Sequence, residues 1–201
     1  MIAGILRLSV VVGLVAFGAG PVAADTVQEK AAVCEACHGE NGVPINKTIP
    51  NIFGQNEGYI YIELRDMQKG TRKNDQMKKG ARKNDQMAPI VENLSREDMF
   101  ALAAYFAAKP WPYLQQPQAS AADAGHFTSM AASAGCVGCH QAGYIGAGTQ
   151  PRLAGQGADY LAKTMLEFRT GARGNNTWMT DLLKTYSEDD ISQMARVLGG
   201  M

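Results

Sequence analysis

Cys34-Glu35-Ala36-Cys37-His38 and Cys136-Val137-Gly138-Cys139-His140 are the two stretches that decide the fold of this chain. Together they use all four cysteines and two of the three histidines in a sequence of 201 residues. Each stretch places two thiols and one imidazole within a single short turn of the backbone. Because the pattern occurs twice and leaves no cysteine over, it predicts two equivalent sites.

A Cys-x-x-Cys-His run lets both thiols reach the two vinyl groups of one porphyrin, with the adjacent histidine under the iron as an axial ligand. Two disulfides or a four-cysteine zinc site would need no histidine after each pair. A redox-active Cys-x-x-Cys normally occurs once, in a thioredoxin-like βαβ context. We therefore expect two covalently attached heme c groups, bound through Cys34, Cys37, Cys136 and Cys139. His126, the third histidine, is expected on a helix surface or in helix packing and is assigned to no site.

An internal repeat surrounds the two motifs. Pro50-Asn51-Ile52-Phe53-Gly54-Gln55 matches Pro151-Arg152-Leu153-Ala154-Gly155-Gln156, and the match continues from Tyr59 to Tyr160 and from Gly70 to Gly171. Ser95 and Asp98 then match Ser187 and Asp190. Self-similarity over this length indicates that each half of the chain is one structural unit with its own site.

A tandem duplication interrupts the first copy of the repeat. Segment 69–78 is nearly repeated as 79–88, so the first half holds two candidate positions for every residue of this segment. In both copies the run Asn-Asp-Gln-Met stands just before the last residue, which is Lys78 in the first copy and Ala88 in the second. The second half has no such insertion.

Helical periodicity dominates the chain, and strand signals are absent, so we expect an all-α fold. Residues 25–37 and 120–136 are expected to form the first helix of each half, and residues 56–69 and 157–170 the second, each ended by glycine. Ser95 and Ser187 are expected to cap the last helices, because acidic residues follow each serine in the first turn.

The N-terminal residues have the pattern of an export signal. A short start containing Arg7 is followed by an apolar run and by small residues up to Ala24, and the run is shorter than the ~18 apolar residues that a membrane span needs. We expect residues 1–24 to be a signal peptide cleaved near Ala24, which places the protein in the periplasm. The expected division of the rest is 25–108 and 120–201 as two domains, with 109–119 as a proline-interrupted linker whose Trp111 and Tyr113 brace the domain interface.

The distal side of each iron needs a ligand, and methionine is the first candidate because a filled position favours simple electron transfer. Met87 precedes the capping Ser95 at the same distance as Met179 precedes Ser187. The upstream copy of the duplication offers Met77 as the alternative. We prefer Met87, since the loop that leads into the last helix sets where the sulfur can reach.

With these motifs, and with Asn41-Gly42, Asn93-Leu94-Ser95, the run 102–106 and their counterparts, the sequence resembles the diheme cytochrome c4 family. The resemblance covers nearly the whole chain after the signal and implies two class I cytochrome c domains in tandem, each a small helical fold around one heme. It implies His38 and His140 as proximal ligands and Met87 and Met179 as distal ligands. It also implies that the backbone carbonyls of Pro50 and Pro151 accept hydrogen bonds from the histidines.

Irons with histidine and methionine on both sides leave no position for a substrate. We expect a periplasmic carrier of single electrons between a quinol-oxidising complex or dehydrogenase and a terminal oxidase. The alternative is the electron-transfer subunit of a periplasmic dehydrogenase complex, and a third hypothesis, a diheme peroxidase, needs one displaceable ligand. Peripheral association with a membrane stays open.

The charge balance is neutral, with 19 basic and 19 acidic residues. A nucleic-acid-binding domain is usually strongly basic, so the composition argues against nucleic acid as a partner. Because irons filled on both sides take no substrate, we expect redox proteins as partners and no small-molecule substrate.

Overall fold

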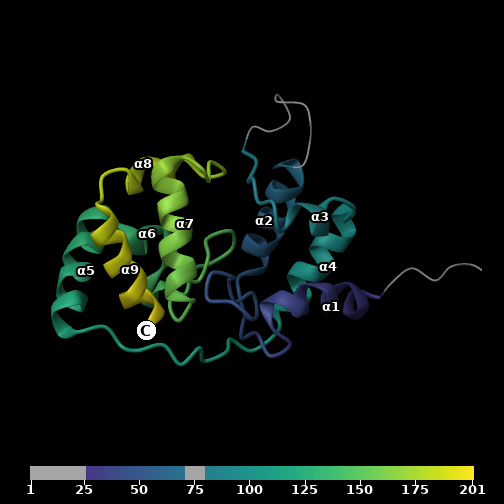
Figure 1. The fold of residues 1–201 in the computed structure, drawn as a ribbon, viewed down its shortest axis with the longest axis horizontal. Coiled ribbons are helices and arrows are strands. Elements are labelled where there is room, and N and C mark those ends of the chain that lie inside the picture. The colour runs from purple at the N-terminus through teal and green to yellow at the C-terminus, as the bar shows by residue number, and fades with distance from the viewer. Residues whose placement is uncertain (1–25, 71–79) are drawn as a thin grey trace, which may run out of the picture.

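The computed structural model describes residues 26–70 and 80–201, which form two helical bundles joined by an extended linker (Figure 1). The first bundle consists of α1 (Val27–His38), α2 (Glu57–Gly70), α3 (Ala88–Val91) and α4 (Arg96–Ala107). The second consists of α5 (Ala121–Ala134), α6 (Cys136–His140), the 3-10 helix η2 (Ala142–Tyr144), α7 (Ala158–Thr170), α8 (Thr177–Leu183) and α9 (Glu188–Gly199). In these described ranges the only β-type pairing is an isolated bridge between Ala147 and Gln150. The all-α expectation is confirmed.

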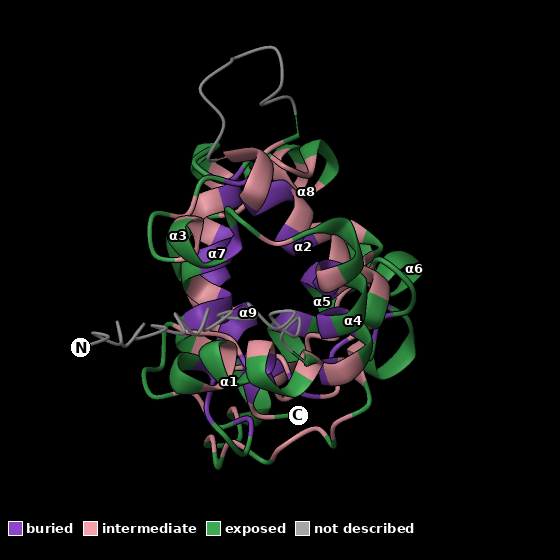
Figure 2. Cartoon of the chain, turned by 90° about the vertical axis from the view of Figure 1, so that its right-hand side faces the viewer, coloured by how far each residue is buried: buried purple, intermediate pink, exposed green. Residues whose placement is uncertain are grey.

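Each bundle has a hydrophobic core of its own. In the first, α2 packs against α4 around Leu102 and Phe106, which are almost fully buried. In the second, α7 packs against α9 around Leu161 and Ile191. Buried stretches of α2, α7 and α9 face inwards, and exposed stretches lie on the outside (Figure 2). Two separate cores are what the internal repeat predicts.

The last helices of the two bundles begin with the expected caps. Ser95 and Ser187 each form a capping box, in which the serine hydroxyl accepts from the N–H of Asp98 or Asp190 and the aspartate accepts from the serine N–H. These bonds satisfy backbone donors that the first turn of a helix leaves without partners. Thr26 and Glu29 form the same box at the start of α1.

Replacing Ser187 by alanine is expected to lower the free energy of unfolding by about 1 kcal/mol, because the N–H of Asp190 loses its acceptor. Urea unfolding of the diheme protein measures the change. Ser192→Ala is the matched control, since Ser192 lies inside the same helix and alanine is the better helix former there. Equal losses from the two variants would contradict the assigned cap.

Two local details differ from the sequence-based expectation. The helix expected over 120–136 ends at Ala134, because Gly135 adopts a left-handed conformation with φ 67°, and Cys136 starts the separate helix α6. The corresponding motif of the first bundle lies within the unbroken helix α1. Met179 was expected in a loop but lies in α8, which Asn176 caps.

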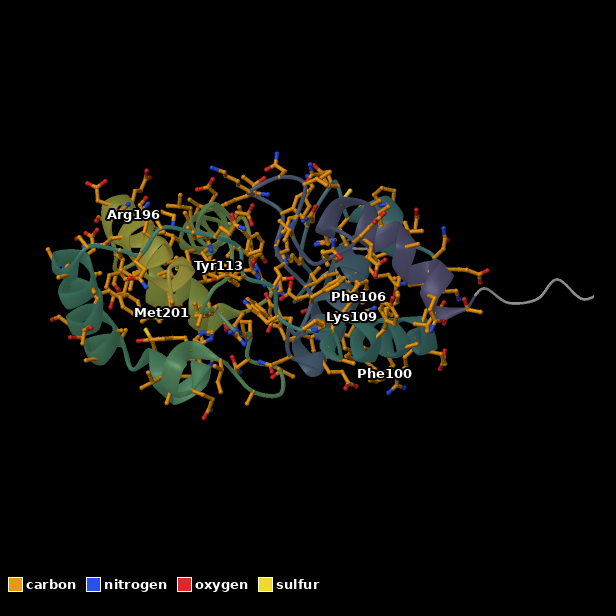
Figure 3. All side chains as sticks on the ribbon, turned by 90° about the horizontal axis from the view of Figure 1, so that it is seen from below. Phe100, Phe106, Lys109, Tyr113, Arg196 and Met201 are labelled. Atoms are coloured by element: carbon orange, nitrogen blue, oxygen red, sulfur yellow. The ribbon has the colours of Figure 1, made fainter. Side chains whose placement is uncertain are left out.

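The linker runs below both bundles in the view of Figure 1 and contacts the loop of each bundle that contains Gly54 or Gly155. Gly54 and Gly155 have φ of 64° and 75°. A Cβ added at Gly54 would lie 2.9 Å from the backbone N of Trp111, and one added at Gly155 would lie 3.0 Å from its Nε1. Arg152 also lies over the Trp111 ring, 4.3 Å from its centroid. Trp111 thus braces the two loops as expected. The expectation for Tyr113 was wrong, because this side chain is 80% exposed on the linker (Figure 3).

The expected signal peptide, 1–24, and the alternative ligand Met77 lie outside the described residues. Among the residues that are described, no helix is long and apolar enough to cross a membrane.

Candidate heme sites

The two motif histidines have the same surroundings in both bundles. His38 ends α1 and His140 ends α6, and both are buried. The Nδ1 of His38 lies 2.8 Å from the carbonyl oxygen of Pro50, and that of His140 lies 3.1 Å from that of Pro151. A carbonyl accepts only, so Nδ1 carries the proton and donates it in this contact. Nε2 is then the unprotonated nitrogen, the one that is able to bind a metal.

The electrostatics of both histidines favour the neutral ring. Burial lowers the pKa of His38 below its ordinary value, although the hydrogen bond to Pro50 acts in the opposite direction. Burial lowers the pKa of His140 in the same way, against the effect of Pro151. Neutral imidazole is the form that ligates a metal, and a hydrogen bond from the other ring nitrogen fixes its orientation.

The cysteines are also equivalent in the two bundles. None of the four forms a disulfide, and in each motif the first cysteine is half-buried and the second exposed. Cys34 packs against the first core and Cys136 against the second. Burial raises the pKa of the Cys34 thiol to about 11 and also raises that of Cys136. In the described part of the chain no group of three or more His, Cys, Asp or Glu side chains is placed to hold a metal ion.

Met87 and Met179 occupy matching positions. The N–H of Met87 donates to Oδ1 of Asn84 at 3.1 Å, and the N–H of Met179 donates to Oδ1 of Asn176 at 3.2 Å. Each methionine is half-buried and packs against the core of its own bundle. Met87, in the downstream copy of the duplication, therefore has surroundings equivalent to those of Met179.

A continuous cavity of about 360 Å³ runs between the bundles and contains both sets of candidate ligands. Its lining includes His38 and Met87 from the first bundle and His140 and Met179 from the second, together with Cys34, Cys37, Pro50 and Pro151. The apolar side chains in the rest of the lining come mostly from α2, α4, α7 and α9. Cys136 and Cys139 precede His140 in α6 and are not part of the lining. Apolar walls, a neutral imidazole and a thioether in each bundle fit a heme, which these side chains would hold.

A buried charge cluster lies between the bundles, and sequence reasoning missed it. Glu63 of α2 accepts hydrogen bonds from Nη1 of Arg82 at 2.6 Å and from Nη2 of Arg173, in the other bundle, at 2.5 Å. Burial by itself would raise the pKa of Glu63, but Arg173 and Arg82 outweigh it and hold the pKa below its ordinary value. Two guanidinium groups therefore share one carboxylate at this interface.

The repeat contains a signal for this cluster. Gly80-Ala81-Arg82 and Gly171-Ala172-Arg173 are identical triplets, and the backbone N–H groups of the two arginines donate to the equivalent helices, to Asp66 O and Glu167 O. No such symmetry marks Glu63, whose counterpart in the second bundle is Thr164. Nη1 of Arg173 donates to the Thr164 hydroxyl at 2.6 Å.

Comparisons with known proteins agree with this geometry. The family model described as cytochrome c matches residues 26–108 and again 128–195. Cytochrome c4 of Azotobacter vinelandii is 34% identical over 92% of this chain and 91% of its own length. The thiosulfate dehydrogenase electron acceptor of Stutzerimonas stutzeri is 31% identical over 82% of this chain and 77% of its length. The crystal structure of reduced cytochrome c4 from Pseudomonas stutzeri superposes with a TM-score of 0.76 at 30% identity, covering 87% of this chain and 96% of that one.

Two family matches in tandem, two cores and two equivalent histidine sites support one assignment. Fold, cofactor and electron-carrier class follow from the family together with the repeated Cys-x-x-Cys-His motif. The chain belongs to the cytochrome c family, as a cytochrome c4-type electron carrier with two cytochrome c domains and two covalently bound heme c groups.

Proposed function

We propose that this protein carries single electrons in the periplasm through two hemes that are each closed on both sides. The ligands in this proposal are His38 and Met87 in domain 25–108, and His140 and Met179 in domain 120–201. The observation that carries it is the matched pair of sites, in which each histidine donates to a proline carbonyl and each methionine lines the same cavity. Heme c supplies the reversible one-electron change of its iron.

The chain's own residues suit a carrier rather than a catalyst. The thioether of methionine favours ferrous iron, and the proline carbonyls hold both imidazoles in one orientation. Filling both axial positions excludes peroxide and other small molecules from the iron.

The far-red charge-transfer band that methionine gives on ferric heme c tests the ligands. We expect the matured protein to show this band for both hemes, Met87→Ala to halve its intensity, and Met77→Ala to leave it unchanged. A high-spin heme in the unmutated protein would contradict a closed carrier and favour peroxide chemistry. A loss in Met77→Ala instead of Met87→Ala would move the first distal ligand into the upstream copy of the duplication.

The electron donor is proposed as a quinol-oxidising complex or a dehydrogenase, and the acceptor as a terminal oxidase. The similarity to a thiosulfate dehydrogenase electron acceptor favours a second candidate, the electron-transfer subunit of a periplasmic dehydrogenase complex. Purification from the periplasm under mild conditions separates the two. A stoichiometric enzyme partner supports the subunit, whereas a monodisperse free cytochrome supports the shuttle.

A further inference from the structure

The peptide group between Pro50 and Asn51 is hydrogen-bonded on both of its sides. Its carbonyl oxygen accepts from Nδ1 of His38 at 2.8 Å. Its N–H, that of Asn51, donates to Oε1 of Gln156 at 2.9 Å. Gln156 belongs to the second domain, so one peptide group connects the histidine of the first domain to a side chain of the other.

The reciprocal arrangement exists in the second domain. The carbonyl of Pro151 accepts from His140 at 3.1 Å, and the N–H of the same peptide, that of Arg152, donates to Oε1 of Gln55 at 2.7 Å. Gln55 lies in the first domain. The two peptide groups are therefore polarised by each other's domain in the same way.

Both glutamines are fixed in place. Gln156 is 2% exposed and Gln55 is 4% exposed. Nε2 of Gln156 donates to the carbonyl of Asn51 at 2.8 Å, and Nε2 of Gln55 donates to the carbonyl of Arg152 at 3.0 Å. Each side-chain amide therefore makes two hydrogen bonds to the loop of the opposite domain. Their Oε1 atoms also accept from the N–H of the next residue, Gly157 or Asn56. A buried amide with its hydrogen bonds satisfied has one defined orientation.

We propose that Gln55 and Gln156 are positioning residues that tune the heme potential of the opposite domain. A peptide whose N–H donates a hydrogen bond has a more polarised carbonyl, because hydrogen bonds in a chain strengthen one another. A stronger acceptor at Pro50 makes the His38 ring more basic, and a more basic ligand stabilises ferric iron. Gln156 thereby lowers the potential of the first heme, and Gln55 lowers that of the second.

This crossed arrangement predicts a crossed effect of mutation. In Gln156→Leu the midpoint potential of the first heme is expected to rise by roughly 30 mV, which corresponds to about a threefold change in the one-electron equilibrium constant. The midpoint potential of the second heme should rise by less. Gln55→Leu is expected to do the reverse. Redox titration followed by proton NMR, with heme methyl signals assigned to each heme, measures the two midpoints separately.

The Nδ1 protons of the histidines provide a second signal, independent of electron-transfer activity. A weaker bond to Pro50 should speed solvent exchange of the His38 Nδ1 proton in Gln156→Leu while leaving that of His140 unchanged. If this variant fails to mature with two hemes, the unbranched Gln156→Met replaces it, and Gln55→Leu tests the same inference from the other side.

Gln116 offers a matched control. Its amide makes three backbone hydrogen bonds, to Ala158, Gln156 and Gly199, but none to a peptide that holds a histidine. Gln116→Leu should leave the difference between the two midpoints unchanged. Equal shifts of both hemes in all three leucine variants, or a shift confined to the mutated domain, would overturn the crossed coupling.

The inference rests on His38 and His140 as the axial ligands proposed above. If the unmutated protein lacks paramagnetically shifted Nδ1 signals from these two residues, the proposed ligation fails. If those signals are present and the glutamine variants leave the midpoints and proton exchange unchanged, only the crossed coupling fails.

Discussion

Glu63→Gln is expected to lower the free energy of unfolding by about 3–5 kcal/mol, because it leaves two buried guanidinium groups without their carboxylate. The Glu63 side chain is 9% exposed, and its partners Arg82 and Arg173 are 9% and 4% exposed. Water therefore cannot solvate the two guanidinium groups when they lose the carboxylate. The partners come from both domains, and the variant should therefore weaken the interface as well as the first domain. Urea unfolding, followed by heme absorbance, measures the loss.

Glu57→Gln is the control for this prediction. Glu57 lies at the exposed start of the same helix, where a carboxylate interacts only with the helix dipole, and its replacement should cost under about 1 kcal/mol. Comparable losses from the two variants would show that the interface cluster adds little. They would also mean that the two arginines find another anion when the hemes are bound.

The same cluster predicts a pH dependence. The pKa of Glu63 is depressed in the folded protein from an ordinary value of 4.5. Its contribution to stability is thus fully present above that value and is lost as the pH falls through the folded pKa. The difference in stability between the parent and Glu63→Gln should shrink as the pH is lowered below this ordinary value. A constant difference down to strongly acidic pH would contradict the assignment.

Replacing both Cys136 and Cys139 by serine is expected to leave a protein with one covalently bound heme instead of two. Thioether bonds require the thiols, and the four cysteines of the chain all belong to the two motifs. Mass spectrometry under denaturing conditions should therefore detect the loss of one heme mass. The absorbance of the reduced protein should fall by half.

The paired variant, with Cys34 and Cys37 replaced by serine, should retain the other heme and give the same mass loss. Each variant then isolates one heme and its far-red band. Retention of both hemes in either variant would contradict covalent attachment through these residues. Unfolding of the domain that lost its heme, with the other domain intact, would show that the two cores in the structure fold separately.

Much of the fold could be read from local pattern. Serines followed by acidic residues marked the starts of α4 and α9, and glycines marked the ends of α2 and α7, because these signals act within one turn of the chain. The break at Gly135 was missed because a single glycine within a helical pattern is compatible with either continuation or a stop. The helix α8 around Met179 was missed because it is short and its cap, Asn176, follows a run of glycine and asparagine.

The residues of the site also differ in how far the sequence predicted them. Cys34, Cys37, His38 and their counterparts were predictable because their spacing along the chain is itself the requirement for attaching a porphyrin. The spacing to Ser95 and Ser187 favoured Met87 over Met77 although their upstream neighbours are identical, and in the structure the N–H groups of Met87 and Met179 have equivalent partners in Asn84 and Asn176. Glu63 carried no signal, since its partners lie in a distant segment and in the other domain.

The sequence by itself determined the number of hemes, their covalent attachment, the candidate proximal histidines and the tandem helical architecture, because each depends on contacts within a few residues or on a repeated motif. Tertiary structure alone decided how the two halves meet. Gln55 and Gln156 reach the peptides that hold the opposite histidines, and Arg173 reaches Glu63, only because folding brings together residues far apart in the chain. Such contacts depend on the relative placement of two cores, which no local spacing specifies.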